Sequence, residues 1–346
     1  MRFTFVVPDL FLPQPPGGML DLYRDLHLPE LEWLFARGAR QKTPGLSLEA
    51  WLFQRFGVID TQPVASVSLR ADGGVPDTTY WLRADPVHLQ AQRDQLALVD
   101  GAMLTITAAE ACALTDSLNQ HFAQDRLKFI PAYPSRWYLA PETLPDLMAR
   151  PLPAVAGKSI NSYLPTGKDA LRWNQIATEI QMLLHTHPVN EARESFGQPT
   201  INSVWFWGGG VCPALDPRPN AEEQIWANDA LARGLALATK QTPQPLPLNF
   251  DALMAQTKTA DAHCVIWDEL RRAAWYGDYE AWHLGLTRLE ADWIKPLCTA
   301  LRRGVISEVT LHAISEQRCI SVMTNPSGRW LFWRRSKPLM HYLPAL

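Results

Sequence analysis

The chain lacks the features that most simply mark a membrane-spanning or a nucleic-acid-binding protein. Its 346 residues contain no unbroken apolar run of the ~20 residues that a transmembrane helix needs. Its formal net charge is −3 at pH 7, whereas a protein built to grip nucleic acid carries a basic face. We therefore expect no membrane and no nucleic acid among its partners.

Cysteine is also scarce. The five cysteines include no C-x-x-C pair, which excludes a zinc knuckle and a thioredoxin-type redox motif. The apolar run at the N-terminus ends after a few residues at Pro8 and Asp9, so it is too short for the apolar core of a secretion signal. These absences predict a cytoplasmic protein with reduced thiols.

Proline and tryptophan, by contrast, are plentiful, with 28 and 14 residues. The prolines cluster at 151–155, 216–219 and 242–248, which is typical of connections between packed elements. The tryptophans gather in WFW at 205–207 and in WLFW at 330–333. Aromatic pairs in short β-like runs are typical of a hydrophobic core, although exposed rings of this kind would suit a protein-interaction module.

Segments with strand and helix periodicity alternate along the chain, which predicts an α/β fold. The runs that indicate strands are 3–7, 64–71, 78–84, 94–101, two short strands within 127–140, 203–207, 262–267, 309–314 and 318–323. The runs that indicate helices are 28–38, 47–57, 107–122, 169–184, 221–238 and 279–301. The pattern of predicted helices and strands changes near residues 60 and 200, which indicates boundaries between parts of the chain.

Two polar groups are candidates for holding an anion. Arg83 and Asp85 lie in RADPVHL, where the arginine could donate to a phosphate, although an internal salt-bridged turn fits the same residues. Asn190 and Arg193 lie three residues apart on a helical turn and could contact one ligand. A capping role for Asn190 fits equally well.

The segment NSVWFWGGG runs from a buried strand into consecutive glycines at 208–210. Glycine allows a backbone to approach a ligand closely. No lysine-serine or lysine-threonine pair follows, so the segment is not a phosphate-binding Walker loop, and the third glycine of a dinucleotide fingerprint is missing.

Acidic residues and a histidine follow or end several predicted strands: Asp9, Asp268, Glu269 and His312. Oxygen and imidazole ligands of this kind could assemble a site for a hard cation if they meet. Sequence spacing cannot show whether they do, and Asp9 could equally cap a turn.

The most specific stretch of the chain is HPVNEARESFGQPTINSVWFWGGGVCP, residues 187–213. Together with VVPD and PELEWLFARG, YPSRWYLA, and VIWDE followed by GDYEAWHLGLTRLEADWIKPL, it resembles the archaeal-type cofactor-independent phosphoglycerate mutases of the alkaline phosphatase superfamily. The resemblance is closer still to bacterial regulatory proteins of the RpfE type. It implies an alkaline-phosphatase-like sheet flanked by helices, built from 1–57 and 200–346, with an inserted α+β cap domain at 58–199.

The resemblance also implies which residues bind ligand: Arg83, Asp85, Arg136, His187, Asn190, Arg193, Asn202, Gly208 and Gly210. In that family a serine or threonine nucleophile and two divalent metals carry phosphoryl transfer, and this chain departs from the pattern. The nucleophile position is displaced to Ser47, and Asp9, Asp268 and His312 are what remains of the metal ligands. Arg271 and Arg272 follow Asp268 and place positive charge where a dication would sit, which opposes metal binding.

We therefore expect a degenerate, non-catalytic phosphoglycerate-mutase-like protein with a regulatory or anionic-ligand-binding role. It would need no cofactor, although a residual Mn, Zn or Mg ion at Asp9, Asp268 and His312 stays open. Its partners would be a small anionic phosphate ligand or another protein. The alternative is an active metal-dependent phosphomutase or phosphatase that acts on a small phosphate ester such as phosphoglycerate, with Ser47 as the nucleophile close to the three metal ligands.

Overall fold

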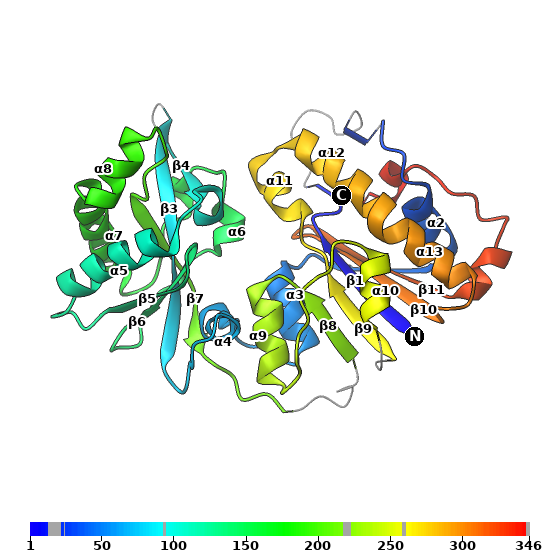
Figure 1. Ribbon diagram of the computed structural model, residues 1–346, viewed down its shortest axis with the longest axis horizontal. Coiled ribbons are helices and arrows are strands. Elements are labelled where there is room, and N and C mark those ends of the chain that lie inside the picture. The colour runs from blue at the N-terminus through cyan, green and yellow to red at the C-terminus, as the bar shows by residue number, and fades with distance from the viewer. Residues whose placement is uncertain (13–21, 24, 93–94, 217–222, 258–260, 344–346) are drawn as a thin grey trace. The chain divides into compact units, whose positions relative to one another are not determined.

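The computed structural model describes residues 1–12, 22–23, 25–92, 95–216, 223–257 and 261–343. The chain forms two compact units, of which unit 1 is Met1–Gly57 with Leu215–Leu346 and unit 2 is Val58–Ala214 (Figure 1). The expected boundary near residue 200 differs from this division, because the strand that follows it belongs to the sheet of unit 2. No helix in the described ranges is both long and apolar enough to cross a membrane.

Unit 1 contains a six-stranded sheet in the order β2-β11-β10-β1-β9-β8. Strands β1, β8, β9 and β10 run parallel, and β11 and β2 add an antiparallel edge. The bounds are β1 (Arg2–Pro8), β2 (Ala39–Pro44), β8 (Glu223–Ala227), β9 (Ala262–Ile266), β10 (Glu308–Ile314) and β11 (Arg318–Thr324). Because the four parallel strands share a direction, the residues that follow them meet at one edge, where ligands bind in open α/β sheets.

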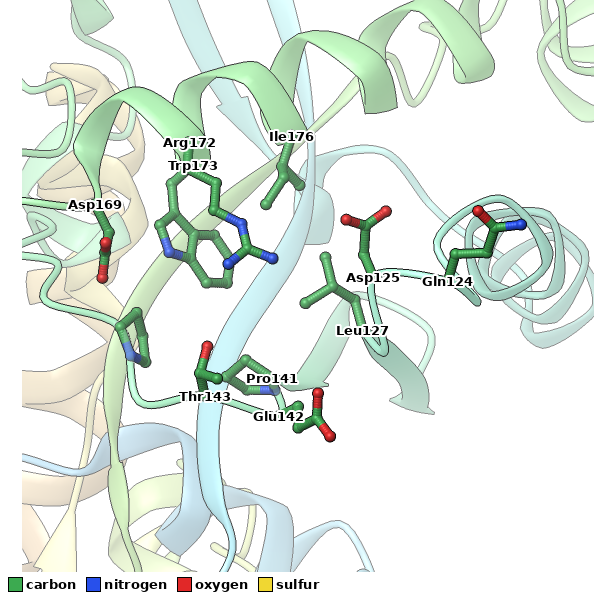
Figure 2. Close-up of a pocket in the computed structure, with 11 residues that line it drawn as sticks. Gln124, Asp125, Leu127, Pro141, Glu142, Thr143, Asp169, Arg172, Trp173 and Ile176 are labelled. Carbon is green, nitrogen blue, oxygen red and sulfur yellow. The ribbon is translucent and has the colours of Figure 1, made fainter.

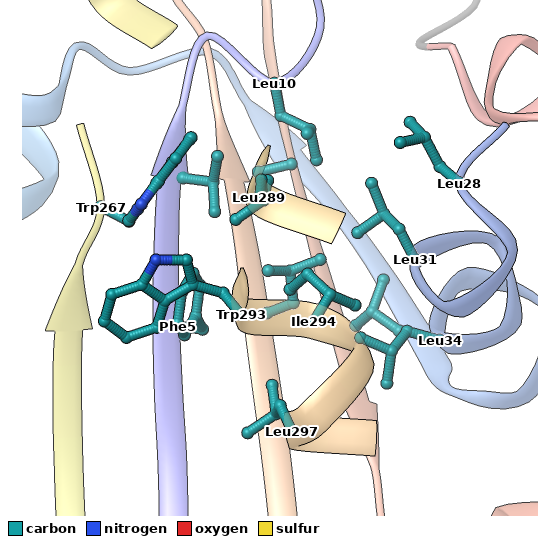
Figure 3. Packing of buried hydrophobic residues seen from close by; sticks show 14 of the residues in the cluster. Phe5, Leu10, Leu28, Leu31, Leu34, Trp267, Leu289, Trp293, Ile294 and Leu297 are labelled. Atoms are coloured by element: carbon teal, nitrogen blue, oxygen red, sulfur yellow. The ribbon is translucent and has the colours of Figure 1, made fainter. Parts of the chain in front are cut away.

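Helices cover both faces of this sheet. They are α2 (Pro29–Arg37), α3 (Leu48–Arg55), α9 (Ala230–Ala238), α10 (Phe250–Gln256), α11 (Leu270–Tyr276), α12 (Tyr279–Arg288), the π-helical turn η3 (Leu289–Ile294), α13 (Lys295–Arg302), and the short 3-10 helices η4 (Pro326–Trp330) and η5 (Leu339–Tyr342). The main core lies where β1, α2 and the η3–α13 run interdigitate (Figure 3). Phe5 of β1 packs there against Trp293, with ring centroids 5.6 Å apart.

Unit 2 is an antiparallel sheet in the order β4-β3-β6-β5, with β7 paired to β3. The strands are β3 (Tyr80–Gln92), β4 (Gln95–Asp100), β5 (Lys128–Tyr133), β6 (Arg136–Ala140) and β7 (Ser203–Val211). The helices are α4 (Val64–Ala71), η1 (Gly101–Met103), α5 (Ala108–His121), α6 (Leu152–Val155), η2 (Ile160–Ser162), α7 (Ala170–His185) and α8 (Pro188–Ser195). The predicted α/β class with an α+β second part is confirmed.

Two predicted elements were wrong. Residues 64–71 form helix α4 and not a strand, and six of its eight residues are buried. The alternation of apolar residues and serines suggested a strand with one polar face. In the helix, both serine hydroxyls instead donate to backbone carbonyls in the preceding turn and are buried. The predicted helix at 221–238 begins instead with strand β8, and 221–222 lie outside the described residues. The glycine stretch does not end the strand before it, since β7 continues through Gly210.

Candidate functional site

Three aspartates stand at the carboxyl ends of adjacent parallel strands in unit 1. Asp9 follows β1, Asp268 follows β9, and Asp229 follows β8. Asp9 turns the chain sharply, with a φ of 57°, and its carbonyl accepts a hydrogen bond from the indole of Trp282 at 3.0 Å. Asp229 caps helix α9 by accepting from the amide of Ala232 at 2.8 Å. This edge of the sheet therefore concentrates negative charge.

A buried arginine supplies the opposite charge. Arg271, in the first turn of α11, is 8% exposed, and its guanidinium donates to Glu49 of α3 at 2.6 Å. Burial alone would lower the pKa of Arg271, but the charges of Glu49, Asp229 and Asp9 outweigh it and raise that pKa. The guanidinium is therefore permanently charged and lies within the electrostatic reach of several carboxylates.

The same cluster changes the pKa values of its acids in opposite directions. Burial raises the pKa of Asp268 to about 6, and the charge of Asp229 adds to the rise while Arg271 opposes it. Burial would also raise the pKa of Glu49, yet the charge and hydrogen bond of Arg271 hold it below its ordinary value. Arg271 is thus committed chiefly to Glu49.

Ser47 belongs to this network. It is the N-cap of α3, where its hydroxyl oxygen accepts from the amide of Ala50 at 3.2 Å. It also hydrogen-bonds to Glu49, which helps to lower the pKa of that carboxyl. The structure therefore brings Ser47, Glu49 and Arg271 together.

His312 lies elsewhere in unit 1, opposite Val6 in the middle of β10. Its ring packs 5.2 Å from that of Trp51, and its Nδ1 is 2.7 Å from the hydroxyl of Ser321. Burial, followed by the charge of Arg55, lowers the pKa of His312 to about 4. His312 is therefore neutral at pH 7 and faces α3.

The residues that the structure describes do not assemble the two-metal site that the resemblance implies. A dication needs oxygen or nitrogen ligands converging within about 2–2.6 Å. Among the residues that the structure describes, no group of three or more His, Cys, Asp or Glu side chains is arranged to hold a metal. Asp9, Asp268 and His312 do not form such a group, and the nearby Glu49 is engaged by a guanidinium.

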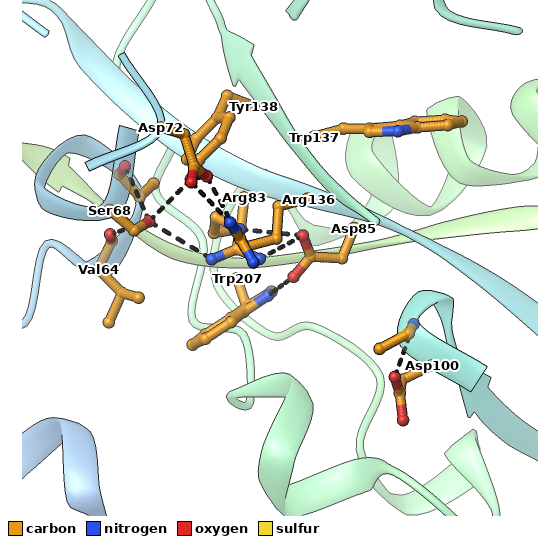
Figure 4. A network of polar contacts seen from close by, with 12 residues as sticks. Val64, Ser68, Asp72, Arg83, Asp85, Asp100, Arg136, Trp137, Tyr138 and Trp207 are labelled. Carbon is orange, nitrogen blue, oxygen red and sulfur yellow. Dashed lines mark hydrogen bonds and ion pairs between the residues drawn. The ribbon is translucent and has the colours of Figure 1, made fainter. Parts of the chain in front are cut away.

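Unit 2 gathers Arg83, Asp85 and Arg136 into a second polar network (Figure 4). Arg83 donates twice to Asp85, at 2.9 and 2.6 Å, and the indole of Trp207 donates to the other oxygen of Asp85 at 2.7 Å. The guanidinium carbon of Arg83 lies 5.2 Å from the ring centre of Tyr138. The structure shows the internal ion pair of Arg83 and Asp85, but it lies within strand β3 and not in the turn that the sequence left open.

Arg136 forms the more accessible half of that network. It donates to both oxygens of Asp72, at 2.8 and 2.6 Å, and Tyr138 donates to the same carboxylate at 2.6 Å. Burial would raise the pKa of Asp72, but these hydrogen bonds and the arginine charge lower it. The side chain of Arg136 is 25% exposed, whereas that of Arg83 is 7% exposed. Arg136 is therefore the more accessible of the two arginines, and anion binding by it stays a prediction.

The remaining predicted ligand residues brace the backbone of unit 2. Asn190 donates to the carbonyls of Leu184 and Ile201 and accepts from the amide of Ile201. Asn202 bonds in the same two-sided way to the amide and carbonyl of Leu89. These bonds join the start of β7 to the α7–α8 connection and to β3.

His187 and Arg193 have similar roles around α8. His187 is its N-cap, with Nδ1 accepting from the amide of Val189 at 3.2 Å. Arg193 is buried and donates to the carbonyls of Pro199 and Leu104 and to Glu110. Their described polar contacts are thus with the protein, and ligand binding by them stays a prediction.

Gly208 and Gly210 serve packing within unit 2. Both have positive φ, 63° and 155°. A Cβ on Gly208 would lie 2.9 Å from Cβ of Val64, and one on Gly210 would lie 2.5 Å from Cβ of Pro63. The close approach that glycine permits here is to the start of helix α4, and approach to a ligand stays a prediction.

Unit 2 also contains a cavity of about 240 Å³ (Figure 2). Its lining includes three carboxylates, Asp125, Glu142 and Asp169, and one arginine, Arg172. None of the predicted ligand-binding residues lines it. This cavity is therefore a poor match for a phosphate, which would be repelled by the carboxylates.

Comparison with known proteins identifies similar sequences. No protein-family model matches the chain. It is 32% identical over 114 residues to the 2,3-bisphosphoglycerate-independent phosphoglycerate mutase of Methanosarcina barkeri, which covers 32% of this chain and 29% of that protein. It is 26% identical over 154 residues to the probable enzyme of the same name from Geobacter sulfurreducens, covering 44% and 38%. The matches thus span well under half the length of these curated relatives.

Solved structures share the fold. The cofactor-independent phosphoglycerate mutase from Thermoplasma acidophilum matches with a TM-score of 0.50 and 15% identity, over 94% of this chain and 89% of that one. The PH0037 protein from Pyrococcus horikoshii matches with a TM-score of 0.57 and 13% identity, over 94% and 87%. The predicted resemblance to cofactor-independent phosphoglycerate mutases is confirmed, and similarity to the RpfE-type proteins stays a prediction.

Several members of the two networks were not predicted from sequence. Glu49 and Asp229 face Arg271, and Asp72, Tyr138 and Trp207 complete the second network. Asp229 was hidden because β8, the strand that it follows, was read as helix. Glu49 lies in the first turn of a helix, where a carboxylate is expected for the helix dipole alone.

Proposed function

We propose that this chain is a non-catalytic relative of the cofactor-independent phosphoglycerate mutases, located in the cytoplasm, with a regulatory or anionic-ligand-binding role. The observation that carries the proposal is the buried guanidinium of Arg271 among acids at the carboxyl edge of the sheet. Two-metal phosphoryl transfer needs cations that contact both the attacking and the leaving oxygens. Arg271 donates to Glu49 instead and supplies one fixed charge.

The electrostatics support the same conclusion. A dication brought beside Arg271 would be repelled by a charge that burial cannot neutralise, since the surrounding acids raise the pKa of that arginine. The guanidinium also offsets the negative charge that would otherwise attract a metal. One guanidinium offsets only part of the charge of these acids, but its position among them opposes a dication, and we place the function of the chain outside phosphoryl transfer.

Removing Arg271 tests this directly. Arg271→Ala leaves Glu49 buried without its partner, which we expect to lower the free energy of unfolding by about 3–5 kcal/mol. With the positive charge gone, Mn²⁺ should raise the melting temperature of the variant after chelator treatment, because a cation bound only to the native state stabilises it. The wild-type protein should have the same melting temperature with and without added Mn²⁺ after chelator treatment. It should not turn over phosphoglycerate in either state.

The neighbouring Arg272 is the matched control, since it is exposed. Arg272→Ala should leave both stability and metal response close to those of the wild type. Turnover of phosphoglycerate by the wild type that requires metal and disappears in Asp9→Ala would refute the proposal. A wild-type metal shift as large as that of Arg271→Ala would refute it as well.

For the anionic ligand, the accessible Arg136 is the residue that we assign. Arg83 is the buried support beside it, through its bonds to Asp85 and its position over Tyr138. A phosphate ester would have to compete with Asp72 for the guanidinium of Arg136. Saturable binding of phosphoglycerate that is lost in Arg136→Gln but kept in Arg126→Gln, an exposed arginine of the same unit, would support this assignment.

The active phosphomutase or phosphatase remains the second candidate, favoured by one observation. Ser47 stands at the N-terminus of α3 and shares a network with Glu49 and Arg271. A helix N-terminus stabilises negative charge, including that of a phosphate. Hydrolysis of a small phosphate ester that is abolished by Ser47→Ala would favour this candidate, and unchanged hydrolysis would exclude Ser47 as the nucleophile.

A further inference from the structure

The strongest feature outside both networks is an exposed aromatic–basic segment, Arg329–Lys337, near the C-terminus. Three large rings project from it, with Trp330 63% exposed, Phe332 75% exposed and Trp333 63% exposed. The WFW run of β7, in contrast, is buried throughout. Soluble proteins rarely expose such apolar side chains together unless the patch meets a partner.

The charged side chains of this part of the sequence have one sign. From residue 317 to the end the sequence has no aspartate or glutamate, but it has five cations: Arg318, Arg329, Arg334, Arg335 and Lys337. The four cations of the segment itself are exposed. In a chain with a net charge of −3, this local concentration of positive charge is complementary to an anionic surface.

The local geometry keeps the rings outward. The segment leaves the 3-10 helix η4 and continues through a turn, and Arg37 of α2 donates to the carbonyl of Phe332 at 3.4 Å. Phe332 and Trp333 meet edge-on, with ring centroids 5.3 Å apart at 79°. Arg329 lies over the ring of Trp330, 4.9 Å from its centroid. The backbone is thus tied to the fold while the side chains remain in solvent.

We infer that the aromatic–basic segment is a docking site for an anionic lipid surface. Tryptophan and phenylalanine beside arginine and lysine are typical of protein segments that lie at the membrane interface, where rings insert and cations contact anionic headgroups. The absence of an apolar run of spanning length concerns helices that cross a bilayer and leaves surface binding open. This inference is independent of the function proposed above.

A lipid surface suits the segment better than a nucleic acid or a protein. Single-stranded nucleic acid stacks its bases along a groove lined by aromatic faces, whereas these rings lie within four residues of one another and two of them meet edge to face. A protein partner would have to provide fitted pockets for three bulky side chains. The headgroup layer of a lipid bilayer is fluid, so it can accommodate such side chains without a preformed pocket.

Vesicle co-sedimentation of the full chain tests the inference. Binding is compared between vesicles of phosphatidylcholine alone and vesicles of phosphatidylcholine and phosphatidylglycerol in equal parts. We expect binding to the anionic vesicles only, weakened by added salt. Arg334→Glu with Arg335→Glu should weaken it by about 25-fold or more, since each cation near an anionic surface contributes about fivefold.

The aromatic side chains have their own test. Trp330→Ala, Phe332→Ala and Trp333→Ala together should weaken vesicle binding by at least about tenfold through loss of apolar insertion. The melting temperature should change little, because these rings are exposed. Matched controls in unit 2 are the exposed cations Lys128→Glu with Lys168→Glu, and the exposed apolar residues Leu144→Ala, Leu171→Ala and Phe196→Ala.

Several outcomes would overturn the inference. One is equal sedimentation of the protein with neutral and with anionic vesicles. Another is the absence of sedimentation with either kind of vesicle. A third is a loss of binding in the unit 2 controls as large as that in the segment variants. A fourth is tighter binding of the wild type to an oligothymidylate than to the vesicles. A fifth is a wild-type protein that does not bind vesicles but forms a dimer, which the triple aromatic variant converts to a monomer.

Discussion

Single side chains decide the chemistry that unit 1 can support. Arg271 reaches across to Glu49, 222 positions away in the sequence, and its charge is maintained by the acids around it. His312 lies two residues before the last residue of β10 and nevertheless packs under α3, where it contacts Trp51 and Ser321. The described contacts of His312 are thus with Trp51 and Ser321, and Arg271 is the cation of the cluster.

The half-buried His312 also makes stability depend on pH. Its pKa is lowered to about 4 in the folded protein, against an ordinary value of 6.5. The unfolded chain therefore binds a proton that the folded chain rejects, so the stability contributed by neutral His312 is present above pH 6.5 and is lost as the pH falls toward 4. The full loss is about 3 kcal/mol.

Denaturant unfolding of the wild type and of His312→Asn between pH 7 and pH 4 checks this. Asparagine keeps a polar partner for Ser321 but does not titrate here. As the pH falls from 7 to 4, the free energy of unfolding of the wild type should decrease by about 3 kcal/mol more than that of the variant. Asp268, whose raised pKa acts in the opposite direction, is present in both proteins and cancels. A constant difference would contradict the burial of a neutral His312.

Among whole elements, β7 shows how a sequence feature can have a packing role. Its glycines let helix α4 approach the strand, with Val64 and Pro63 occupying the space where side chains would be. The glycine run therefore determines how a helix packs on the sheet of unit 2.

Gly208→Ala should be strongly destabilising, because it combines a left-handed backbone with a contact of 2.9 Å to Val64. Gly197 is the matched control, since its φ of 67° is close to the 63° of Gly208 but a Cβ there would meet nothing within 4 Å. Gly197→Ala should cost only the backbone strain, about 1–2 kcal/mol, and Gly208→Ala clearly more. Thermal unfolding measures both, and equal losses would show that α4 does not pack as closely as described.

For the whole molecule, the division into two units predicts an independent fold. Unit 2 is one continuous stretch of chain, Val58–Ala214, with buried clusters of its own around Trp137, Trp173 and Phe206. A continuous segment with its own hydrophobic core can fold alone. Unit 1 consists of two separate stretches of the chain, so it cannot be expressed as one continuous fragment.

Residues 58–214, expressed alone, should therefore give a cooperative thermal transition and a near-ultraviolet circular dichroism spectrum of packed tryptophans. The matched comparison is a fragment that ends at residue 199, the boundary expected from sequence. It lacks β7, and with it the partner of β3 and the side chains of Val204 and Phe206. That shorter fragment should not fold cooperatively, and equal folding of the two would contradict the placement of β7.

The elements with strong local signals could be predicted from the sequence. Helix α5 begins at the capping box of Thr107 and Glu110, α2 ends at Gly38, and β1 and β9 appear as short apolar runs. In each case the free energy that favours the element comes from residues within a few positions. The acids that follow β1 and β9, Asp9 and Asp268, could be placed for the same reason.

The pairing of distant side chains was decided by the tertiary structure alone. Sequence order does not show that Glu49 meets Arg271, or that WFW is buried while WLFW is exposed. The apolar–serine pattern of α4 was equally ambiguous until β7 packed against it. Burial and electrostatic energies depend on neighbours from far along the chain, so the same residue types become a core, an ion pair or an exposed surface only when the elements have packed.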